Sequence, residues 1–451
     1  MICKGKKLKG TEAKDPTKIV GKNGVVLRKS NYDSAGSGYR TYEVYQRERV
    51  GESTEKIKPS ELISDSFRFD PYSSLEILRE NYPCYRDWLS NCYWITRYND
   101  VTSIFSDDAN FETRPKNHFL RAEGLGKDMG SELSVLFAQE KSFDEDTSRI
   151  TSKLIEELLT NRTVDLATDF AAVLPLKILA EQYGVSDEES SQFGHRYWRM
   201  QRGTSWDPRL QMDGKNAAQE LLDFFAGKIR SGEHKDMENC LSAMVALGAK
   251  EKDVVATLLN TDHETMHGAL SNLWFNMLTS PDKFEKARSS KRMLKLAYLE
   301  TLRHSPPVLS AERFALREIE RFGRLIPEGA RLICSAGAAN RDPRIFDNPE
   351  EFTVDRRDMC QREPRGQYRA DGLASGIAFA LGRPSIHPAV PEDRPRSMYA
   401  IIRDASVSAS QILIESTRGI QLEKQEGVYL SCLTVGEMHT CWKLPVSLQA
   451  G

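Results

Sequence analysis

Apolar residues at helical spacing dominate this sequence from about residue 60 onward. In residues 149–160, one helical face carries Ile150, Leu154, Ile155 and Leu158. The same periodicity recurs in four longer segments, at 165–183, 217–229, 253–278 and 290–303. Strand-like runs are short and few, at 93–96, 313–316 and 330–334. The pattern therefore predicts a mainly α fold with small β-sheets.

The first 57 residues differ from the rest in composition. They are rich in Lys, Gly, Ser and Thr, with strand-like runs at 24–28 and 39–45 that a turn-rich stretch separates. An isolated hairpin is marginally stable in water. We therefore expect residues 1–57 to be an N-terminal extension, either a β-hairpin or a disordered arm, and residues 58–451 to form a single domain.

The charge balance excludes several classes of protein. The chain has 63 Lys and Arg against 65 Asp and Glu, a net charge of −2, and phosphate neutralisation by a duplex-binding protein needs a basic excess. No window approaches 18 consecutive apolar residues, and no apolar run follows the basic start of the chain. We expect a cytoplasmic protein with no membrane span and no nucleic-acid partner.

The eight cysteines show no paired spacing. They are scattered without a C-x-x-C motif, at positions 3, 84, 92, 240, 334, 360, 432 and 441. In a cytoplasmic chain this usage predicts reduced thiols rather than a disulfide framework or a zinc knuckle.

Several short motifs, in order, resemble the soluble bacterial cytochromes P-450 over roughly residues 65–425. They are Phe-Asp-Pro-Tyr at 69–72, Glu-Thr-Leu-Arg-His-Ser-Pro-Pro at 300–307, Ile-Pro-Glu-Gly at 326–329 and Ala-Asn-Arg-Asp-Pro at 339–343. Each motif is weak alone, but their shared order and spacing make a chance match very improbable. The resemblance implies the helical prism of that family.

Three charged residues match a structural network of the family. Glu300 and Arg303 are three residues apart and so share a helix face, and Arg356 follows downstream. The resemblance implies that one carboxylate serves both guanidinium groups in a buried cluster.

The segment 261–267 contains the candidate catalytic residues. Glu264 and Thr265 match the acid and the alcohol that handle oxygen and its protons in cytochromes P-450. Asp262 stands where the family has a small residue, and His263 where glycine is common. We take all four residues as candidates for acid/base chemistry.

The same segment also spells a zinc motif. His263, Glu264 and His267 form His-Glu-x-x-His, in which two imidazoles four apart on a helix share a zinc ion and the glutamate acts as general base. A third ligand is needed and no downstream pattern supplies it, so zinc is a distant alternative.

The segment that holds the haem iron in the family departs from its pattern. Phe379 and Gly382 fit, but Ile386 occupies the position of the ligand cysteine, and no cysteine lies between Cys360 and Cys432. In the family, that cysteine thiolate is the axial haem ligand.

Three of the four residues that bind the haem propionates in the family are also replaced. Asp146 and Ile150 stand at the positions of a propionate-binding His and Arg, and Pro384 replaces a second His. Arg313 matches a propionate arginine and is retained. His387 lies beside the ligand position, and imidazole is a known haem ligand, so a histidine-ligated haem is an alternative.

These residues predict a cytochrome P-450-fold protein of natural-product biosynthesis that has lost haem-thiolate monooxygenase chemistry. We expect it to bind or act on a small apolar metabolite without a cofactor, either as a non-redox enzyme or as an auxiliary partner of a glycosyltransferase or another pathway enzyme. The alternative is a haem-dependent oxidoreductase with His387 as axial ligand and Arg313 on a propionate.

Overall fold

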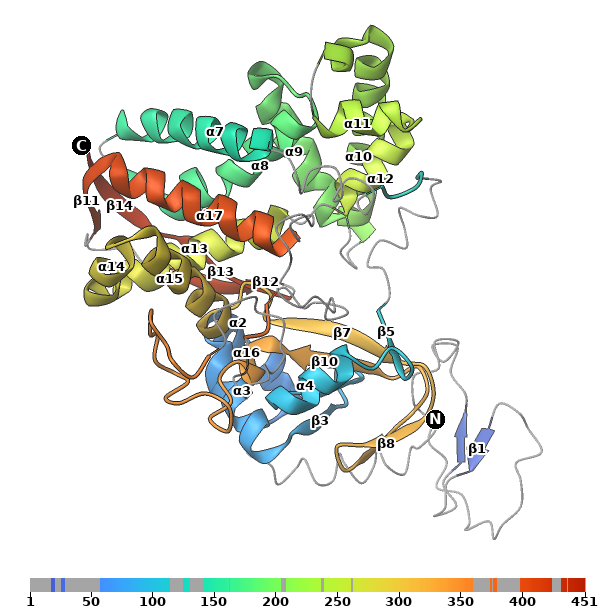
Figure 1. Ribbon diagram of the computed structural model, residues 1–451. Helices are drawn as coiled ribbons and strands as arrows, with labels where there is room; N and C mark the ends of the chain where they lie inside the picture. Colours follow the sequence, from blue (N-terminus) through green and yellow to red (C-terminus); the bar gives the residue numbers. More distant parts are fainter. Residues whose placement is uncertain are drawn as a thin grey trace. The chain divides into compact units, whose positions relative to one another are not determined.

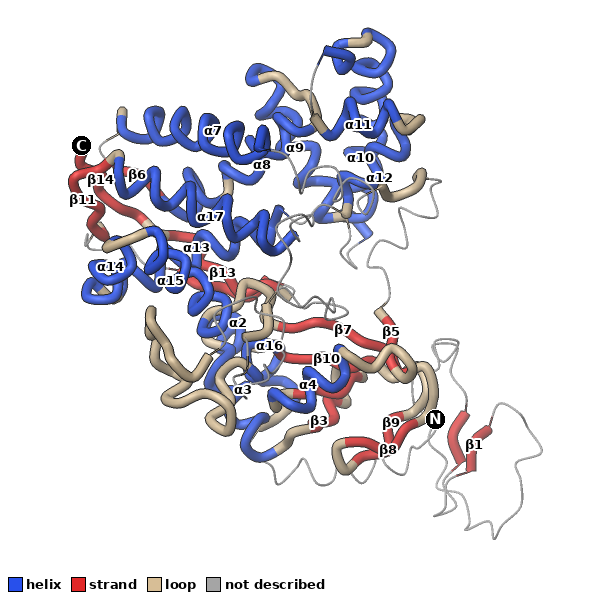
Figure 2. Tube along the Cα trace, viewed as in Figure 1, coloured by secondary structure: helices blue, strands red, loops and turns tan. Residues whose placement is uncertain are grey.

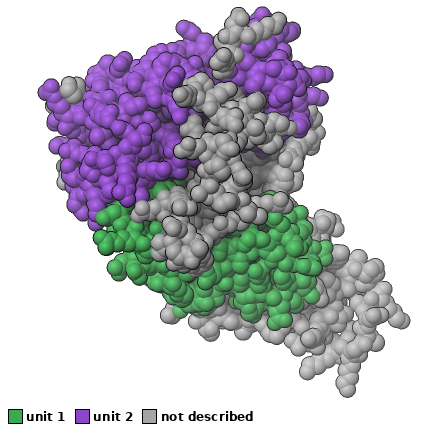
Figure 3. Space-filling model, in the orientation of Figure 1, with its two compact units in different colours: residues 1–114, 299–386, 431–440 green, residues 115–298, 387–430, 441–451 purple. Residues whose placement is uncertain are grey.

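A computed structural model gives the architecture of the protein (Figure 1). The structure describes residues 18–20, 26–28, 57–113, 125–129, 141–161, 163–203, 208–236, 239–260, 263–359, 374, 376–378, 398–423, 431–435 and 437–450. The chain forms two compact units, one from residues 1–114, 299–386 and 431–440 and the other from residues 115–298, 387–430 and 441–451 (Figure 3). We call them unit 1 and unit 2.

Unit 1 is built on a five-stranded sheet. Its strands, in the order β3-β4-β10-β7-β5, are β3 (Cys84–Asp87), β4 (Cys92–Ile95), β10 (Arg331–Ser335), β7 (Ser310–Ala315) and β5 (Phe111–Glu112). β10 pairs parallel with β4, whereas the other neighbours are antiparallel. The turn before β10 uses Gly329 at φ 71°, a left-handed conformation that glycine adopts without strain.

Short helices and a hairpin complete unit 1. They are η3 (Pro59–Ile63), α2 (Asp65–Phe69), α3 (Pro71–Asn81), α4 (Tyr98–Phe105), α16 (Ala336–Ala339) and the hairpin of β8 (Ile319–Arg321) and β9 (Arg324–Ile326). α3 begins where the Asp70 side chain accepts a hydrogen bond from Tyr72 N, with Pro71 in the first turn, which is a favourable helix start. One apolar core joins α2 and α3 to the sheet, through residues such as Phe67, Leu75 and Trp94.

Unit 2 is predominantly helical (Figure 2). Its helices are α7 (Lys141–Leu159), α8 (Val173–Gln182), α9 (Asp187–Arg202), α10 (Pro208–Ser231), η5 (Glu233–Asp236), α11 (Cys240–Ala246), α12 (Glu251–Leu259), α13 (His263–Thr279), α14 (Pro281–Arg288) and α17 (Met398–Glu415). A core rich in aromatic and methionine side chains lies among α8 to α12, and it includes Phe193, Tyr197, Met200, Phe225 and Met244.

A three-stranded sheet and a π-helix accompany these helices. The sheet has the order β11 (Thr417–Leu422), β14 (Pro445–Ala450) and β6 (Thr163–Asp165), all antiparallel. The π-helix η4 (Leu166–Ala171) follows β6 directly, and it packs against α13. The Asp165 carboxylate accepts hydrogen bonds from Ala167 N and Leu444 N, which fixes the corner between strand and helix.

Two elements are divided between the units. α15 (Lys291–His304) has residues 291–298 in unit 2 and 299–304 in unit 1. β13 (Met438–Lys443), which pairs with β12 (Ser431–Val435) of unit 1, has its residues 441–443 in unit 2.

The prediction of a mainly α fold with small β-sheets is confirmed. The predicted strands at 93–96, 313–316 and 330–334 correspond to β4, β7 and β10, each shifted slightly. Two helix predictions are wrong in part: the segment 165–183 is a π-helix followed by α8, and the segment 253–278 is two helices, α12 and α13, separated after Leu259. Asn260 ends α12 by placing its side-chain amide on the Ala256 carbonyl, a local bond that competes with helix continuation.

The N-terminal region contains one described hairpin. β1 (Lys18–Val20) pairs antiparallel with β2 (Val26–Arg28), so the strand-like run at 24–28 does form a strand. The second run, at 39–45, lies outside the described residues. The division into an extension and a single domain over 58–451 stays a prediction.

Candidate functional site

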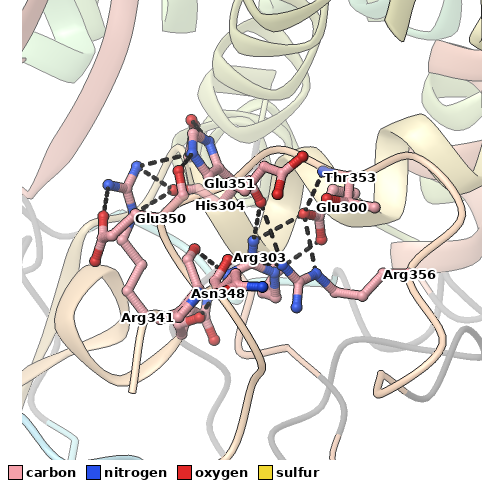
Figure 4. A network of polar contacts seen from close by, with 12 residues as sticks. Glu300, Arg303, His304, Arg341, Asn348, Glu350, Glu351, Thr353 and Arg356 are labelled. Carbon is pink, nitrogen blue, oxygen red and sulfur yellow. Dashed lines mark hydrogen bonds and ion pairs between the residues drawn. The ribbon is translucent and has the colours of Figure 1, made fainter. Parts of the chain in front are cut away.

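A buried ionic cluster forms at the end of α15 (Figure 4). Arg303 donates from Nε and Nη2 to the two carboxylate oxygens of Glu300, both at 2.8 Å. Arg356 donates from Nε to Glu300 Oε1 at 3.2 Å, and Thr353 N donates to the same oxygen at 2.9 Å. One carboxylate thus serves two guanidinium groups, and each of the three charged side chains is at most 4% exposed.

The remaining donors of the two arginines hold the chain that follows. Arg303 Nη1 donates to the carbonyls of Asn340 and Pro349, at 2.9 and 2.8 Å. Arg356 Nη1 donates to the Asp347 carbonyl at 2.6 Å. Because charge-assisted bonds of this kind are short and directional, the cluster fixes residues 340–356 against α15.

Asn340 links this fixed segment to Ile377, which precedes the segment that holds the haem iron in the family. Its amide donates to the Ile377 carbonyl at 2.7 Å and accepts from Ile377 N at 2.6 Å. Sequence reasoning assigned Asn340 to a motif but gave it no role. The signal that could have found it is a buried amide in a loop, since such a side chain needs two backbone partners.

His304 and Arg341 lie beside this cluster. Arg341 donates from Nε to the His304 carbonyl at 2.9 Å and its guanidinium stacks on the ring of Tyr72, 3.5 Å from the centroid. His304 Nε2 lies 3.0 Å from the Glu350 carbonyl. Burial, followed by the nearby arginines Arg341 and Arg303, holds the pKa of His304 well below its ordinary value, so this imidazole is neutral.

Arg313 lies on β7 as a buried cation. Its side chain is 5% exposed, its guanidinium stacks 4.6 Å from the ring centroid of Phe105, and Nη1 donates to the Glu312 carbonyl at 2.8 Å. Burial lowers the pKa of Arg313, which reflects the cost of a desolvated charge. A carboxylate ligand would offset that cost, so the position is suited to bind an anionic group.

The start of α13 carries the candidate acid and alcohol. Thr265 is buried, at 3% exposed, and His263 and Glu264 are the first two residues of the helix. Asp262 lies outside the described residues. The structure thus places Glu264 and Thr265 on α13, and their role as the acid and the alcohol stays a prediction.

His267 is a packed core residue of unit 2. It is 3% exposed, its ring meets Trp442 edge-on at 5.2 Å, and it is hydrogen-bonded to the backbone of Ala167. Burial lowers the pKa of His267 to about 4. Among the residues that the structure describes, no group of three or more His, Cys, Asp or Glu side chains is placed to hold a metal ion, and the zinc site stays a prediction.

Two of the other positions that match haem-binding residues of the family lie in the described part of the chain, and three do not. On α7, Asp146 accepts a hydrogen bond from the exposed Arg149, and Ile150 is buried, so neither offers a donor to a propionate. Pro384, Ile386 and His387 lie outside the described residues, and the match of Ile386 to the family's cysteine stays a prediction. Arg313 is the anchor position whose geometry fits an anionic group.

Comparisons with known proteins agree with this architecture. A family model described as Cytochrome P450 matches residues 285–363, the stretch that contains Glu300, Arg303 and Arg356. The chain belongs to the cytochrome P450 superfamily. It is 27% identical over 363 residues to 6-deoxyerythronolide B hydroxylase of Saccharopolyspora erythraea, covering 72% of this chain and 87% of that protein.

Two further similarities support the same assignment. Pulcherriminic acid synthase of Bacillus subtilis is 24% identical over 399 residues, which cover 82% of this chain and 94% of the synthase. The structure of the Bacillus subtilis bacillaene polyketide synthase cytochrome P450 PksS superposes with a TM-score of 0.68 at 21% identity, over 87% of this chain and 100% of that chain. The cytochrome P450 fold is therefore shown.

The expectation that the protein works without a cofactor is wrong. The related proteins and the matching structures are cytochromes P450, and cytochromes P450 are haem proteins. The error came from giving the unmatched anchor positions more weight than the family as a whole. Separately, no helix in the described part of the chain is long and apolar enough to cross a membrane.

Proposed function

We propose that this cytochrome P450 is a haem-dependent oxidoreductase that acts on a small, largely apolar metabolite in a biosynthetic pathway. The observation that carries the proposal is Arg313, a buried guanidinium on β7 at the position that matches the family's propionate arginine. Hydroxylase, synthase and polyketide-biosynthesis names among the relatives support the metabolite class.

Arg313 would hold one haem propionate. Its ring contact with Phe105 restricts the guanidinium plane, and Nη1 donates to the Glu312 carbonyl, so the guanidinium is held in a fixed orientation. Burial removes the guanidinium charge from water at a cost in free energy, and a bound carboxylate would offset part of that cost.

His387 would hold the haem iron. No cysteine lies between residues 360 and 432, and this histidine is adjacent to the position that matches the family's cysteine. Bound haem would supply one-electron chemistry with oxygen or peroxide, and imidazole ligation would tune it toward peroxidase-like behaviour. The chain itself would contribute an acid, Glu264, and a buried alcohol, Thr265, both on α13, to hold and pass a proton.

Titration of purified protein with haemin tests the proposal. We expect uptake of one haem with a Soret band. In Arg313→Leu the dissociation constant should rise about tenfold or more, equivalent to about 1.4 kcal/mol, because one charged bond to a propionate is lost. Arg317→Leu is the matched control, since Arg317 is an exposed arginine four residues further on that donates to Asn110.

The same titration tests the axial ligand. His387→Ala should shift the Soret band and weaken haem binding, and the reduced protein with CO should lack the red-shifted band of a thiolate ligand. Equal haem affinity in the wild type, Arg313→Leu and Arg317→Leu would contradict the role of Arg313. A thiolate-type CO spectrum would contradict the role of His387 and leave haem binding standing.

A partner enzyme of the same pathway, such as a glycosyltransferase, stays a prediction. Co-purification of the protein with an enzyme of its biosynthetic cluster would support that prediction, and its behaviour as a lone monomer in cell extract would oppose it.

A further inference from the structure

Two serines on α17 have hydroxyls that their own helix does not satisfy. Ser406 and Ser410 lie one turn apart and are completely buried. A serine or threonine inside a helix commonly donates to the backbone carbonyl four residues earlier. Other such residues of unit 2 do so, with donor–acceptor distances of 2.6 to 2.8 Å: Ser148, Thr151, Thr257 and Thr279. In the described part of the chain, neither Ser406 nor Ser410 has this bond or any other hydrogen-bond partner for its hydroxyl.

The hydroxyl of Tyr298 on α15 lies beside Ser406. Tyr298 is also completely buried, and it belongs to unit 2 together with α17. Burial raises the pKa of this phenol, and the adjacent Ser406 side chain opposes the rise, so the two hydroxyls are within reach of each other. Their geometry nevertheless gives no hydrogen bond between them. Two charged side chains near Tyr298, those of Arg403 and Asp404, are bonded to each other at 2.8 Å.

Three buried hydroxyls without a partner are unfavourable in a protein interior. A buried polar group that makes no hydrogen bond loses its hydration without compensation, and most such groups have a protein atom or an ordered water as partner. A buried water typically makes about three hydrogen bonds to groups of this kind. Ser406 and Ser410 share one face of α17, since residues four apart are neighbours on a helix surface, and Tyr298 faces Ser406 from α15. The three hydroxyls thus offer a buried water the number of partners that it needs.

We infer that unit 2 holds an internal water site between α15 and α17, where bound water bridges the hydroxyls of Tyr298, Ser406 and Ser410. The bridge joins two helices by polar contacts that neither helix makes alone. It also makes the serines stabilising at positions where alanine is intrinsically the better helix former. The site does not depend on haem.

Substitution of one serine tests the site through the sign of the stability change. Ser406→Ala removes one partner of the water, so the equilibrium constant for unfolding should rise at least about fivefold relative to Ser408→Ala, equivalent to about 1 kcal/mol. Ser408→Ala is the matched control for helix propensity, because Ser408 is a half-buried serine on the same helix. A Ser406→Ala protein that is as stable as Ser408→Ala, or more stable, shows a dry hydroxyl and overturns the proposal.

Coupling between the two helices tests whether the hydroxyls share the water. Tyr298→Phe removes only the phenolic hydroxyl. The double variant Tyr298→Phe/Ser406→Ala should unfold at least about threefold less readily than the product of the two single effects on the equilibrium constant, because the second substitution acts on a bridge already broken. Additive losses overturn the proposal. If Ser406→Ala fails to fold, Ser410→Ala takes its place in both measurements, with the same expected direction.

A crystal structure of the wild-type protein at high resolution identifies the occupant. We expect electron density for water within hydrogen-bond distance of both Tyr298 Oη and Ser406 Oγ. A direct hydrogen bond between the two hydroxyls, or the absence of density between them, overturns the proposal.

Discussion

Arg303 donates two parallel hydrogen bonds to the carboxylate of Glu300, one to each oxygen, and both side chains are completely buried. Such a pair persists in a protein interior only when its remaining donors and acceptors are also satisfied, as they are here by Arg356 and by backbone groups. The pair therefore organises residues 340–356, and Asn340 in turn holds the backbone of Ile377.

Loss of this pair should destabilise the protein strongly. Arg303→Met leaves Glu300 buried with half of its donors, and we expect the free energy of unfolding to fall by about 3–5 kcal/mol. Urea unfolding followed by circular dichroism measures the change.

An exposed pair at the same spacing provides the control for that variant. Arg288 and Glu285 on α14 are also three residues apart, with side chains 42% and 62% exposed. Arg288→Met should cost at most about 0.5 kcal/mol, because exposed pairs contribute little. Equal losses in the two variants would show that burial does not govern the contribution of the Glu300 pair.

A strap of residues 125–129 lies along α12 and should not tolerate a side chain at Gly126. Lys127 N donates to Asp253 Oδ1 at 2.8 Å, Met129 N donates to Thr257 Oγ1 at 2.9 Å, and Gly126 N donates to the Lys252 carbonyl at 3.1 Å. A Cβ on Gly126 would lie 2.0 Å from Asp253 Oδ1 and 2.8 Å from Asp253 N. Backbone atoms of α12 cannot move to make room at low cost.

Gly126→Ala should therefore detach the strap from α12. We expect trypsin to cleave after Lys127 at least about tenfold faster, equivalent to about 1.4 kcal/mol of local stability. Gly227→Ala is the control, since no atom lies within 4 Å of a Cβ at that position on α10. Cleavage at the wild-type rate in Gly126→Ala would mean that the strap is held by other contacts.

His267 should make the protein less stable in acid. Burial lowers the pKa of this imidazole from 6.5 to about 4, so as the pH falls through this window the unfolded chain takes up the proton first and the folded state loses stability. At a pH of about 4.5 this one group costs about 2–3 kcal/mol relative to neutral pH.

Removal of the titrating group should flatten that pH dependence. His267→Gln keeps a donor for the Ala167 backbone, and we expect the difference between unfolding free energies at pH 7.5 and about 4.5 to shrink by about 2–3 kcal/mol. His195→Gln, at an exposed position on α9, should leave the difference as in the wild type. A pH dependence that is the same in His267→Gln and the wild type would place the titration elsewhere.

Periodicity and motif spacing predicted the main elements but not the break in the long helix. The apolar pattern runs through residues 253–278 with little interruption, and it carries no information about Gln201, which reaches the Leu259 carbonyl from α9. A local signal was present in Asn260, since short polar residues favour caps over helix interiors.

The candidate site was predictable only in part for a similar reason. The spacing of Glu300 and Arg303 predicts that they share a helix face. Only the family resemblance predicted that Arg356 would join them. The role of Asn340 depends on a contact with Ile377 that no local sequence pattern encodes. The cofactor was misjudged because single anchor positions were read one by one, although binding of a large group is distributed over many contacts.

The haem content of the purified protein tests the central claim most directly. After expression with a haem precursor, a pyridine haemochrome assay should give about one haem per chain, together with a Soret band in the native spectrum. A folded protein, verified by circular dichroism, that carries no haem and takes up none from added haemin would contradict the account.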